Sequence, residues 1–239
     1  MQRFVLGTAA ALAVTGSAMA ADMPVKAPPV TRAPPVQVYN WTGCYVNGGG
    51  GYGMFNQDIR EEGAKDTIGG RGWFGTVGGG CDLQVGGSWV FGVFGDYDFS
   101  GLKGNLVLPA TGSAGRDKET SAWAVGGRLG YTLTPTILTY VNAGYTQARF
   151  AGINLDADAL SIGSHTYTGW FLGGGYEYRL DWFPGLFWRT EYRFAQYGRD
   201  TLPILEGGAP TGNTITSDKT VQTIRSELVW RFNWGGGRY

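Results

Sequence analysis

The sequence has one histidine, two cysteines and no strong excess of either charge. A metal site built from several histidines is therefore excluded, and the scattered carboxylates do not form a calcium-binding loop, so we expect no metal and no cofactor. The formal net charge is zero, so we expect no nucleic-acid partner. No apolar stretch is long enough for a transmembrane helix, which excludes a helical membrane protein.

The N-terminal residues have the features of an export signal. Arg3 is followed by the short apolar run Phe4–Val14 and by a small-residue cleavage motif that ends at Ala20. We therefore expect a signal peptide over residues 1–20, cleaved between Ala20 and Ala21, rather than a retained anchor. Residues 21–40 carry five prolines and few apolar residues, which predicts an extended periplasmic tether. The remaining residues, 41–239, form the predicted barrel domain.

Glycine and aromatic residues are abundant, with 42 glycines and 14% aromatics, and eight segments alternate large apolar with small or polar residues. These segments are residues 44–52, 73–84, 89–100, 121–131, 137–146, 169–178, 186–195 and 222–234. In the seventh, Trp188 and Tyr192 alternate with Arg189, Glu191 and Arg193. A period of two indicates β-strands with two unlike faces. Either the aromatics form a soluble core, or they face lipid and the charges line a lumen.

The connections between the segments alternate in length. Short links lie at Gly86-Gly87, Thr134-Pro135 and Pro184-Gly185, whereas the other links are long and polar: residues 53–72, 101–120, 147–168 and 196–221. This arrangement is typical of outer-membrane barrels, with turns in the periplasm and loops outside the cell. The sequence predicts an all-β fold, an eight-stranded antiparallel up-and-down transmembrane β-barrel with short periplasmic turns and long extracellular loops.

Ten charged residues share the predicted inner face: Asp96, Asp98, Arg128, Glu177, Arg189, Glu191, Arg193, Arg225, Glu227 and Arg231. The interior of an eight-stranded barrel is just wide enough for side chains to fill it. Because buried ions need partners, the equal tally of acids and bases favours a hydrogen-bonded network that plugs the lumen. The alternative is an ion-conducting constriction lined by charge.

Cys44 and Cys81 lie on the outward faces of neighbouring predicted strands, near the same rim. The oxidising periplasm permits a cross-strand disulfide, but disulfide geometry is restrictive. Two lipid-facing thiols are the alternative. Most tryptophans fall at strand ends or on outward faces, where their rings anchor a barrel at the membrane interface; they are Trp41, Trp73, Trp89, Trp123, Trp170, Trp188, Trp230 and Trp234.

Several motifs are similar to those of a known family. Asn40-Trp41-Thr42-Gly43-Cys44-Tyr45, Gly127-Arg128-Leu129-Gly130-Tyr131, Gly175-Tyr176-Glu177-Tyr178 and Glu191-Tyr192-Arg193-Phe194 resemble the small alphaproteobacterial outer-membrane β-barrel (porin-like) family. The resemblance covers nearly the whole mature chain. It implies a Gram-negative outer-membrane protein with a structural or porin-like role, inserted by the barrel-insertion machinery. Family members usually carry an aromatic residue where Cys44 stands and end near an Arg-Phe pair, whereas here Arg231-Phe232 is followed by seven residues ending in Tyr239.

Some members of this family are tethered to peptidoglycan through a mature N-terminus that begins Ala-Asp. The resemblance therefore implies attachment through Ala21 and Asp22, although a good post-cleavage sequence would look the same. Its other implied partners are outer-membrane lipids, with a monomeric or weakly oligomeric state.

We expect no enzymatic activity. His165 stands near Asp158, Ser161 and Ser164 in a predicted loop, an arrangement similar to the rim of an outer-membrane lipid A palmitoyltransferase. Such chemistry needs a rigidly placed base, which a solvated loop does not provide. The expected role is envelope integrity and surface display, with weak nonspecific passage of solutes. The competing hypothesis is a soluble periplasmic lipocalin-like barrel that binds a small apolar ligand, which inward charges would disfavour.

Overall fold

The structure is a computed structural model, and it describes residues 39–61, 64–107, 114–155 and 160–232. The predicted signal peptide, the cleavage site at Ala20 and Ala21, Asp22 and most of the predicted tether lie outside these residues, as do Trp234 and Tyr239. Within the described ranges, no helix is long and apolar enough to cross a membrane.

The described residues form twelve antiparallel strands. Eight of them are long and four are short. The long strands are β1 (Gly43–Glu61), β2 (Ala64–Val85), β3 (Trp89–Ser100), β5 (Ala114–Thr134), β6 (Ile137–Phe150), β9 (His165–Arg179), β10 (Leu186–Tyr197) and β12 (Ala209–Phe232). The short strands are β4 (Lys103–Val107), β7 (Ile153–Asn154), β8 (Leu160–Ile162) and β11 (Asp200–Glu206).

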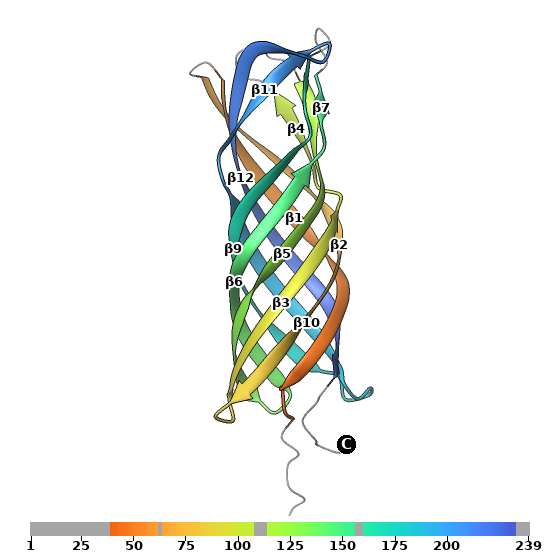
Figure 1. Cartoon of the computed structure of the whole chain (residues 1–239). Helices are drawn as coiled ribbons and strands as arrows, with labels where there is room; N and C mark the ends of the chain where they lie inside the picture. Colours follow the sequence, from red (N-terminus) through yellow and green to blue (C-terminus); the bar gives the residue numbers. More distant parts are fainter. Residues whose placement is uncertain (1–38, 62–63, 108–113, 156–159, 233–239) are drawn as a thin grey trace, which may run out of the picture. The chain divides into compact units, whose positions relative to one another are not determined.

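The eight long strands close on themselves into a barrel, each pairing with its neighbours in the chain (Figure 1). The last strand, β12, completes the ring by pairing with β1 over a long register, from Cys44 opposite Phe232 to Arg60 opposite Thr216. Closure leaves no free sheet edge along this part of the barrel, so every strand has two hydrogen-bonded neighbours. The predicted up-and-down barrel is confirmed.

Tight turns join the strands at one end. β2 and β3 are linked through Gly86 and Gly87, whose φ angles of 63° and 84° lie in the left-handed region that favours glycine. Gly185, with φ 81°, has the same role before β10. We call this end of the barrel the turn end and the opposite end the loop end.

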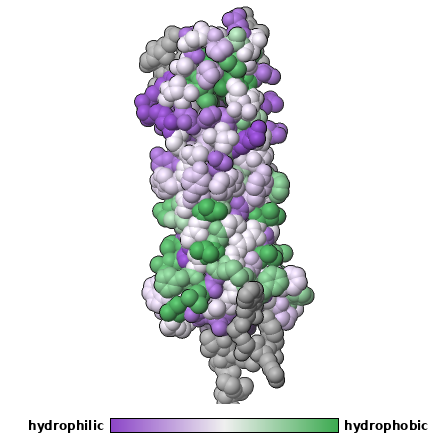
Figure 2. Space-filling model, in the orientation of Figure 1, coloured by the Kyte–Doolittle hydropathy of each residue, from purple (hydrophilic) through white to green (hydrophobic). Residues whose placement is uncertain are grey.

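A belt of apolar side chains covers the outside of the barrel next to the turn end. Trp73 is the most exposed of them on β2, at 74%, and Val93 on β3 is 67% exposed. Aromatic pairs mark both edges of the belt: Trp89 with Tyr131 near the turns, and Trp123 with Tyr145 on the far side. Figure 2 shows this apolar zone below a mostly hydrophilic one. An outward apolar band between aromatic girdles is the mark of a barrel embedded in lipid. We call it the apolar band.

The predicted long loops are wrong in extent, because most of these residues continue the barrel as strands beyond the apolar band. β1 runs on to Glu61, and β12 already begins at Ala209. Residues here still alternate between the two faces, but the large apolar side chains now point into the barrel and the polar ones point outward. On β1, Phe55 and Ile59 are buried inside while Met54 and Asn56 are exposed.

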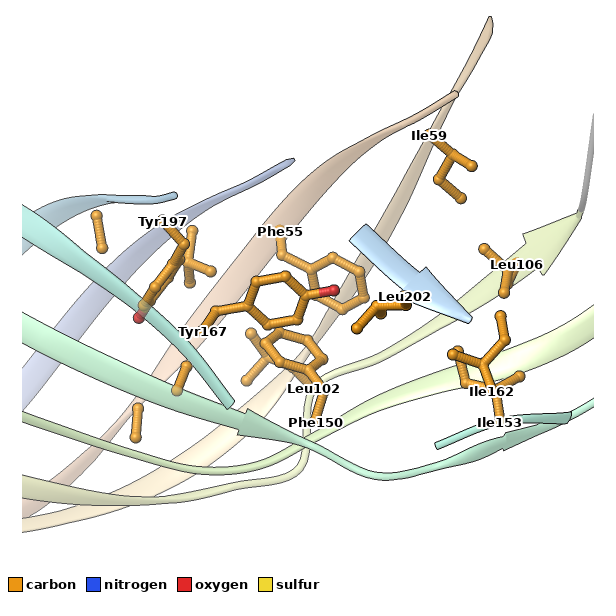
Figure 3. Packing of buried hydrophobic residues seen from close by; sticks show 14 of the residues in the cluster. Phe55, Ile59, Leu102, Leu106, Phe150, Ile153, Ile162, Tyr167, Tyr197 and Leu202 are labelled. Carbon is orange, nitrogen blue, oxygen red and sulfur yellow. The ribbon is translucent and has the colours of Figure 1, made fainter. Parts of the chain in front are cut away.

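The inward side chains of this extension pack into an apolar core, which we call the upper core (Figure 3). Its main members are Phe55, Ile59, Leu102, Leu106, Phe150, Ile153, Ile162, Tyr167, Leu202, Ile204 and Ile215. Each large apolar side chain buried in this way contributes about 1.5–3 kcal/mol. The extension is therefore a packed structure in its own right, not a set of separate loops.

A second apolar cluster fills the barrel at the turn end, and we call it the lower plug. It comprises Trp41, Tyr45, Val90, Leu138, Phe187 and Val229. The Trp41 ring lies 5.0 Å from that of Phe187 and is fully buried. Its backbone N–H donates to the Gln84 side chain at 2.8 Å. The predicted interfacial position of Trp41 is thus wrong, because the residue precedes β1 and folds back into the lumen.

Cys44 and Cys81 lie directly opposite each other on β1 and β2 and form a disulfide bond. The first of the two alternatives for this pair is therefore the one present. The bond joins the two strands near the turn end, on the outer face.

Candidate functional site

The lumen between the lower plug and the upper core is filled with ionisable side chains. All ten residues predicted for the inner face lie there, and Asp82 joins them. We call these eleven residues the charge lattice. No side chain in it is more than 11% exposed. Their positions follow from strand parity, since each occupies the inward register of β2, β3, β5, β9, β10 or β12.

Glu177 is the hub of the half of the lattice that lies nearer the turn end. Its carboxylate accepts hydrogen bonds from Arg231 Nε at 2.6 Å, from Arg189 Nη2 at 3.0 Å and from Arg128 Nη1 at 3.3 Å. The residue is completely buried. One carboxylate on β9 thus joins its strand to three others, β5, β10 and β12, through charge-assisted bonds, which are stronger than neutral ones.

Asp82 is the second acid of this half. It accepts from Arg128 Nε and from Arg231 Nη1, each at 2.7 Å. Its parity in the sequence already places it on the inner face, but the ten predicted charges do not include it. With Asp82 added, the lattice holds six acids and five arginines.

The Tyr45 ring packs among three of these guanidinium groups. The Cζ atoms of Arg128 and Arg189 each lie 4.7 Å from its centroid, and that of Arg231 lies at 4.9 Å. Such contacts stabilise desolvated cations. Tyr45 therefore joins the lower plug to the charge lattice.

The half nearer the loop end is built around Asp96 and Glu191. Arg193 binds both, with N–O distances of 2.8 Å to each carboxylate. Glu191 also accepts from Tyr140 Oη at 2.9 Å and from Asn142 Nδ2 at 2.8 Å.

Two further residues complete the lattice. Arg225 lies 3.0 Å from Asp98 and 3.3 Å from Asp96. Glu227 connects the two halves, since its carboxylate accepts from Arg189 Nη1 at 3.3 Å and lies 3.9 Å from Arg225 Nη1. Each of the eleven residues therefore has an oppositely charged partner within the lattice.

The cavities given by the described residues inside the barrel are small. Two that border the charge lattice measure about 10 Å³ and 20 Å³, and one in the upper core measures about 10 Å³. Each is of the size that a single water molecule needs. A hydrated ion or a solute would have to displace several paired side chains in order to pass.

Three buried ionisable residues lie beyond the apolar band and were missed because they fall in segments predicted as loops. Lys219 forms an ion pair with Asp117 within the upper core, and its ammonium lies 3.4 Å from the centre of the Phe150 ring. Glu119 is buried nearby. The inward position of Lys219 could have been predicted from the sequence, because it is separated from the inward Arg225 and Glu227 by an even number of positions along β12.

Burial changes the acid–base behaviour of these residues. Desolvation raises the pKa of Glu119 to about 7, against the opposing effect of a hydrogen bond from Ser100. Desolvation also lowers the pKa of Lys219, although the Asp117 carboxylate works in the other direction. Glu119 therefore titrates near neutral pH.

His165 is not in a loop, contrary to prediction, but begins β9 and lies opposite Phe150 on β6. Its Nε2 lies 3.0 Å from the Asp200 carboxylate. Among the described contacts neither Ser161 nor Ser164 bonds to it, and Asp158 lies outside the described residues. Across the ranges that the structure describes, no three His, Cys, Asp or Glu side chains could hold a metal ion.

Comparisons with known proteins agree with this geometry. The family model described as "Outer membrane protein beta-barrel domain" matches residues 8–232. The chain is 29% identical over 251 residues to a 31 kDa outer-membrane immunogenic protein of Brucella melitensis, covering 97% of this chain and 100% of that protein. It is 28% identical over 235 residues to a 25 kDa outer-membrane immunogenic protein of Brucella abortus, covering 97% and 99%.

Among solved structures, the chain is similar to the outer membrane protein OprG from Pseudomonas aeruginosa. The TM-score is 0.53 at 14% identity, over 81% of this chain and 98% of that one. At this identity the likeness concerns the fold alone.

Proposed function

We propose that this chain, which belongs to the outer membrane protein β-barrel domain family, is a closed structural barrel of the outer membrane. Its role is to contribute to envelope integrity and surface display. The loop end faces the cell exterior and the turn end the periplasm. The single observation that carries the proposal is the continuous filling of the lumen by the lower plug, the charge lattice and the upper core.

The charge lattice supports a sealing role rather than conduction. A conducting constriction needs water on both sides of its charged ring, so that ions can enter and leave. Here the lattice is enclosed between two apolar clusters, and its carboxylates and guanidinium groups bind one another. Charged side chains that bind one another directly in a narrow lumen leave no sites for permeant ions.

The extracellular extension supports a display role. Because the upper core holds the strand ends together, surface segments emerge from a rigid support well beyond the apolar band. Recognition residues on such a support need less ordering when they bind a partner than residues on free loops.

The lipocalin-like alternative is set aside. It requires an apolar cup and a polar exterior, whereas Glu177 and Arg231 are buried inside this barrel and Trp73 and Val93 are exposed outside. The family relationship places the protein in the outer membrane.

The proposal is tested by deleting the gene and measuring survival in deoxycholate and EDTA, with the wild-type gene supplied in trans. We expect the deletion strain to be more sensitive and the supplied gene to restore resistance. Unchanged sensitivity in the deletion strain would reject the envelope role.

Weak porin activity is the second candidate, and it requires the charge lattice to open. Liposome swelling with sugars of increasing size measures it directly. Swelling above the level of protein-free liposomes would favour a porin and reject the sealed lumen.

Peptidoglycan attachment through Ala21 and Asp22 stays a prediction, as do the barrel-insertion machinery as a partner and a monomeric or weakly oligomeric state. Residues 21–38 lie outside the described residues, so only sequence and resemblance support the attachment. If it occurs, lysozyme digestion of sodium dodecyl sulfate-washed sacculi releases the protein, and a variant with Ala21 and Asp22 replaced is absent from the sacculi. Equal amounts of both proteins in the detergent-soluble fraction would reject it.

A further inference from the structure

The outer surface just beyond the apolar band carries a row of cations on adjacent strands. Lys103 on β4 lies directly opposite Arg71 on β2 and directly opposite Lys118 on β5. All three side chains are exposed. We call these three residues the basic row. Like charges that face one another across a sheet are destabilising, so the arrangement costs the free protein stability.

Among the described residues, the acids that flank Lys118 on β5 do not share the face of the basic row. The two carboxylates of this part of β5, Asp117 and Glu119, point inward and are buried. Within the described part of the chain, none of the three cations forms an ion pair, whereas the exposed Arg199 does so with Asp218 at 3.8 Å. The row therefore offers uncompensated positive charge to an external anion.

A recess lies beside the basic row, where the sheet forks. The pairing of β2 with β4 consists of Arg71 with Lys103 and Gly70 with Gly104, and beyond it the two strands separate. The space between them measures about 350 Å³. Its floor is the Phe55 ring, with which a Cβ atom at Gly70 would collide.

The recess is lined by cationic, amide and apolar side chains, and this combination indicates which chemical groups it can bind. Arg71 and Lys103 supply positive charge, and the exposed amides of Asn56 and Asn105 supply donors and acceptors for hydroxyl groups. Met54 is 52% exposed on the side of the apolar band. Phosphate, sugar hydroxyls and the start of an acyl chain are the groups that this set would bind.

The position of the recess relative to the membrane indicates that this ligand is a lipid headgroup. Arg71 precedes the exposed Trp73 by two residues on the same face of β2, which is about 7 Å along the strand. This is the level at which headgroups of the outer leaflet lie when Trp73 marks the interface.

We propose that the recess and the basic row bind the phosphorylated sugar headgroup of an outer-leaflet glycolipid. The proposal rests on the outer-membrane placement of the barrel but not on its being closed. A bound phosphate neutralises the facing cations, and the acyl chains lie against the apolar band.

The test compares an Arg71→Gln/Lys103→Gln variant with an Arg60→Gln/Arg149→Gln control, which removes the same charge from exposed positions outside the row. Each protein in phosphatidylcholine nanodiscs is titrated with diphosphoryl lipid A, and the bound lipid is counted by native mass spectrometry. One cation near a membrane surface changes affinity about fivefold, so we expect the row variant to bind about thirtyfold more weakly. The control should bind as wild type does.

Three results would overturn the proposal. The first is equal binding by the row variant and the control. The second is equal retention of fully dephosphorylated lipid A. The third is displacement of the lipid by millimolar inorganic phosphate, which would indicate a site for the free anion.

Folding is checked separately in lipid-free zwitterionic micelles. Because the row variant loses a like-charge contact, it should unfold at the same temperature as wild type or a higher one. A lower unfolding temperature would show that the cations are already satisfied within the protein, against the proposal. None of these results depends on survival of the deletion strain, so failure here is distinguishable from failure of the envelope role.

Discussion

Replacing Glu177 by glutamine tests the charge lattice at its hub. The change keeps the shape of the side chain but removes the charge that three arginines share, with N–O distances of 2.6, 3.0 and 3.3 Å. Arg128 and Arg231 keep Asp82 as a partner, and Arg189 keeps Glu227.

The expected magnitude follows from this count of partners. Removing one member of a buried ionic group costs about 3–5 kcal/mol, because its partners stay buried without compensation. Since every arginine retains one carboxylate, we expect the lower limit, about 3 kcal/mol. This is more than a hundredfold in the folding equilibrium constant.

The assay is urea unfolding of the purified protein in detergent micelles, followed by tryptophan fluorescence. The control is Glu206→Gln, an exposed acid on the hairpin between β11 and β12, which should stay within about 0.5 kcal/mol of wild type. An equally small effect of Glu177→Gln would refute the reasoning.

A double-mutant cycle makes the test specific to pairing. If Glu177 and Arg189 stabilise each other, Glu177→Gln with Arg189→Gln is less destabilised than the sum of the single changes by about 1 kcal/mol or more. Strict additivity would mean that the two side chains are independent and that the charge lattice does not act as a connected network.

Further predictions concern pH, the disulfide and packing. Since the pKa of Glu119 is raised from 4.5 to about 7, its protonated form stabilises the fold below about pH 4.5, and this stability is lost as pH rises through 7. Glu119→Gln should flatten the pH dependence of the melting temperature over this window; superimposable profiles would contradict it. Reducing the Cys44–Cys81 bond, which spans 37 residues, should lower the free energy of unfolding by up to about 4 kcal/mol, and an unshifted urea midpoint on reduction would count against this. Gly144→Leu should abolish the heat-modifiable folded band on gels, because its Cβ would collide with the Val125 carbonyl, whereas Gly163→Ala, with open space around it, should leave the band intact.

The membrane-embedded half of the barrel could be predicted from the sequence because lipid imposes one simple rule on it. Apolar residues such as Trp188 and Tyr192 must face outward, so the charged residues between them must face inward. The short turns set the register of pairs such as β2 and β3, but Cys44 and Cys81 face each other across β1 and β2, which meet at the loop end. Their pairing therefore stayed one of two alternatives in the sequence.

The extracellular half was misread because the same alternation continues there with the opposite polarity. Phe55 and Ile59 point inward as a soluble protein's core residues do, while their neighbours face water. The inversion at the edge of the apolar band is visible in the sequence, but a search for outward apolar residues ends at that edge. For this reason the inward positions of three charged residues were not predicted: Lys219, Asp117 and Glu119.

Other features depend on contacts that no local pattern encodes. The pairing of β5 with β6 shifts register between Glu119 and Ser121, which turns Glu119 inward against the parity of Ala122. The entry of Trp41 into the lower plug depends on the space left between Phe187 and Arg231, which come from β10 and β12.

Single-channel recording in planar bilayers tests the sealed lumen most directly. The purified protein, with its folded state verified by heat modifiability on gels, is added to one side of the membrane and a voltage is applied. A lumen filled at three levels predicts a flat current trace, indistinguishable from that of protein-free bilayers. Reproducible conductance steps that appear only with the folded protein would contradict it.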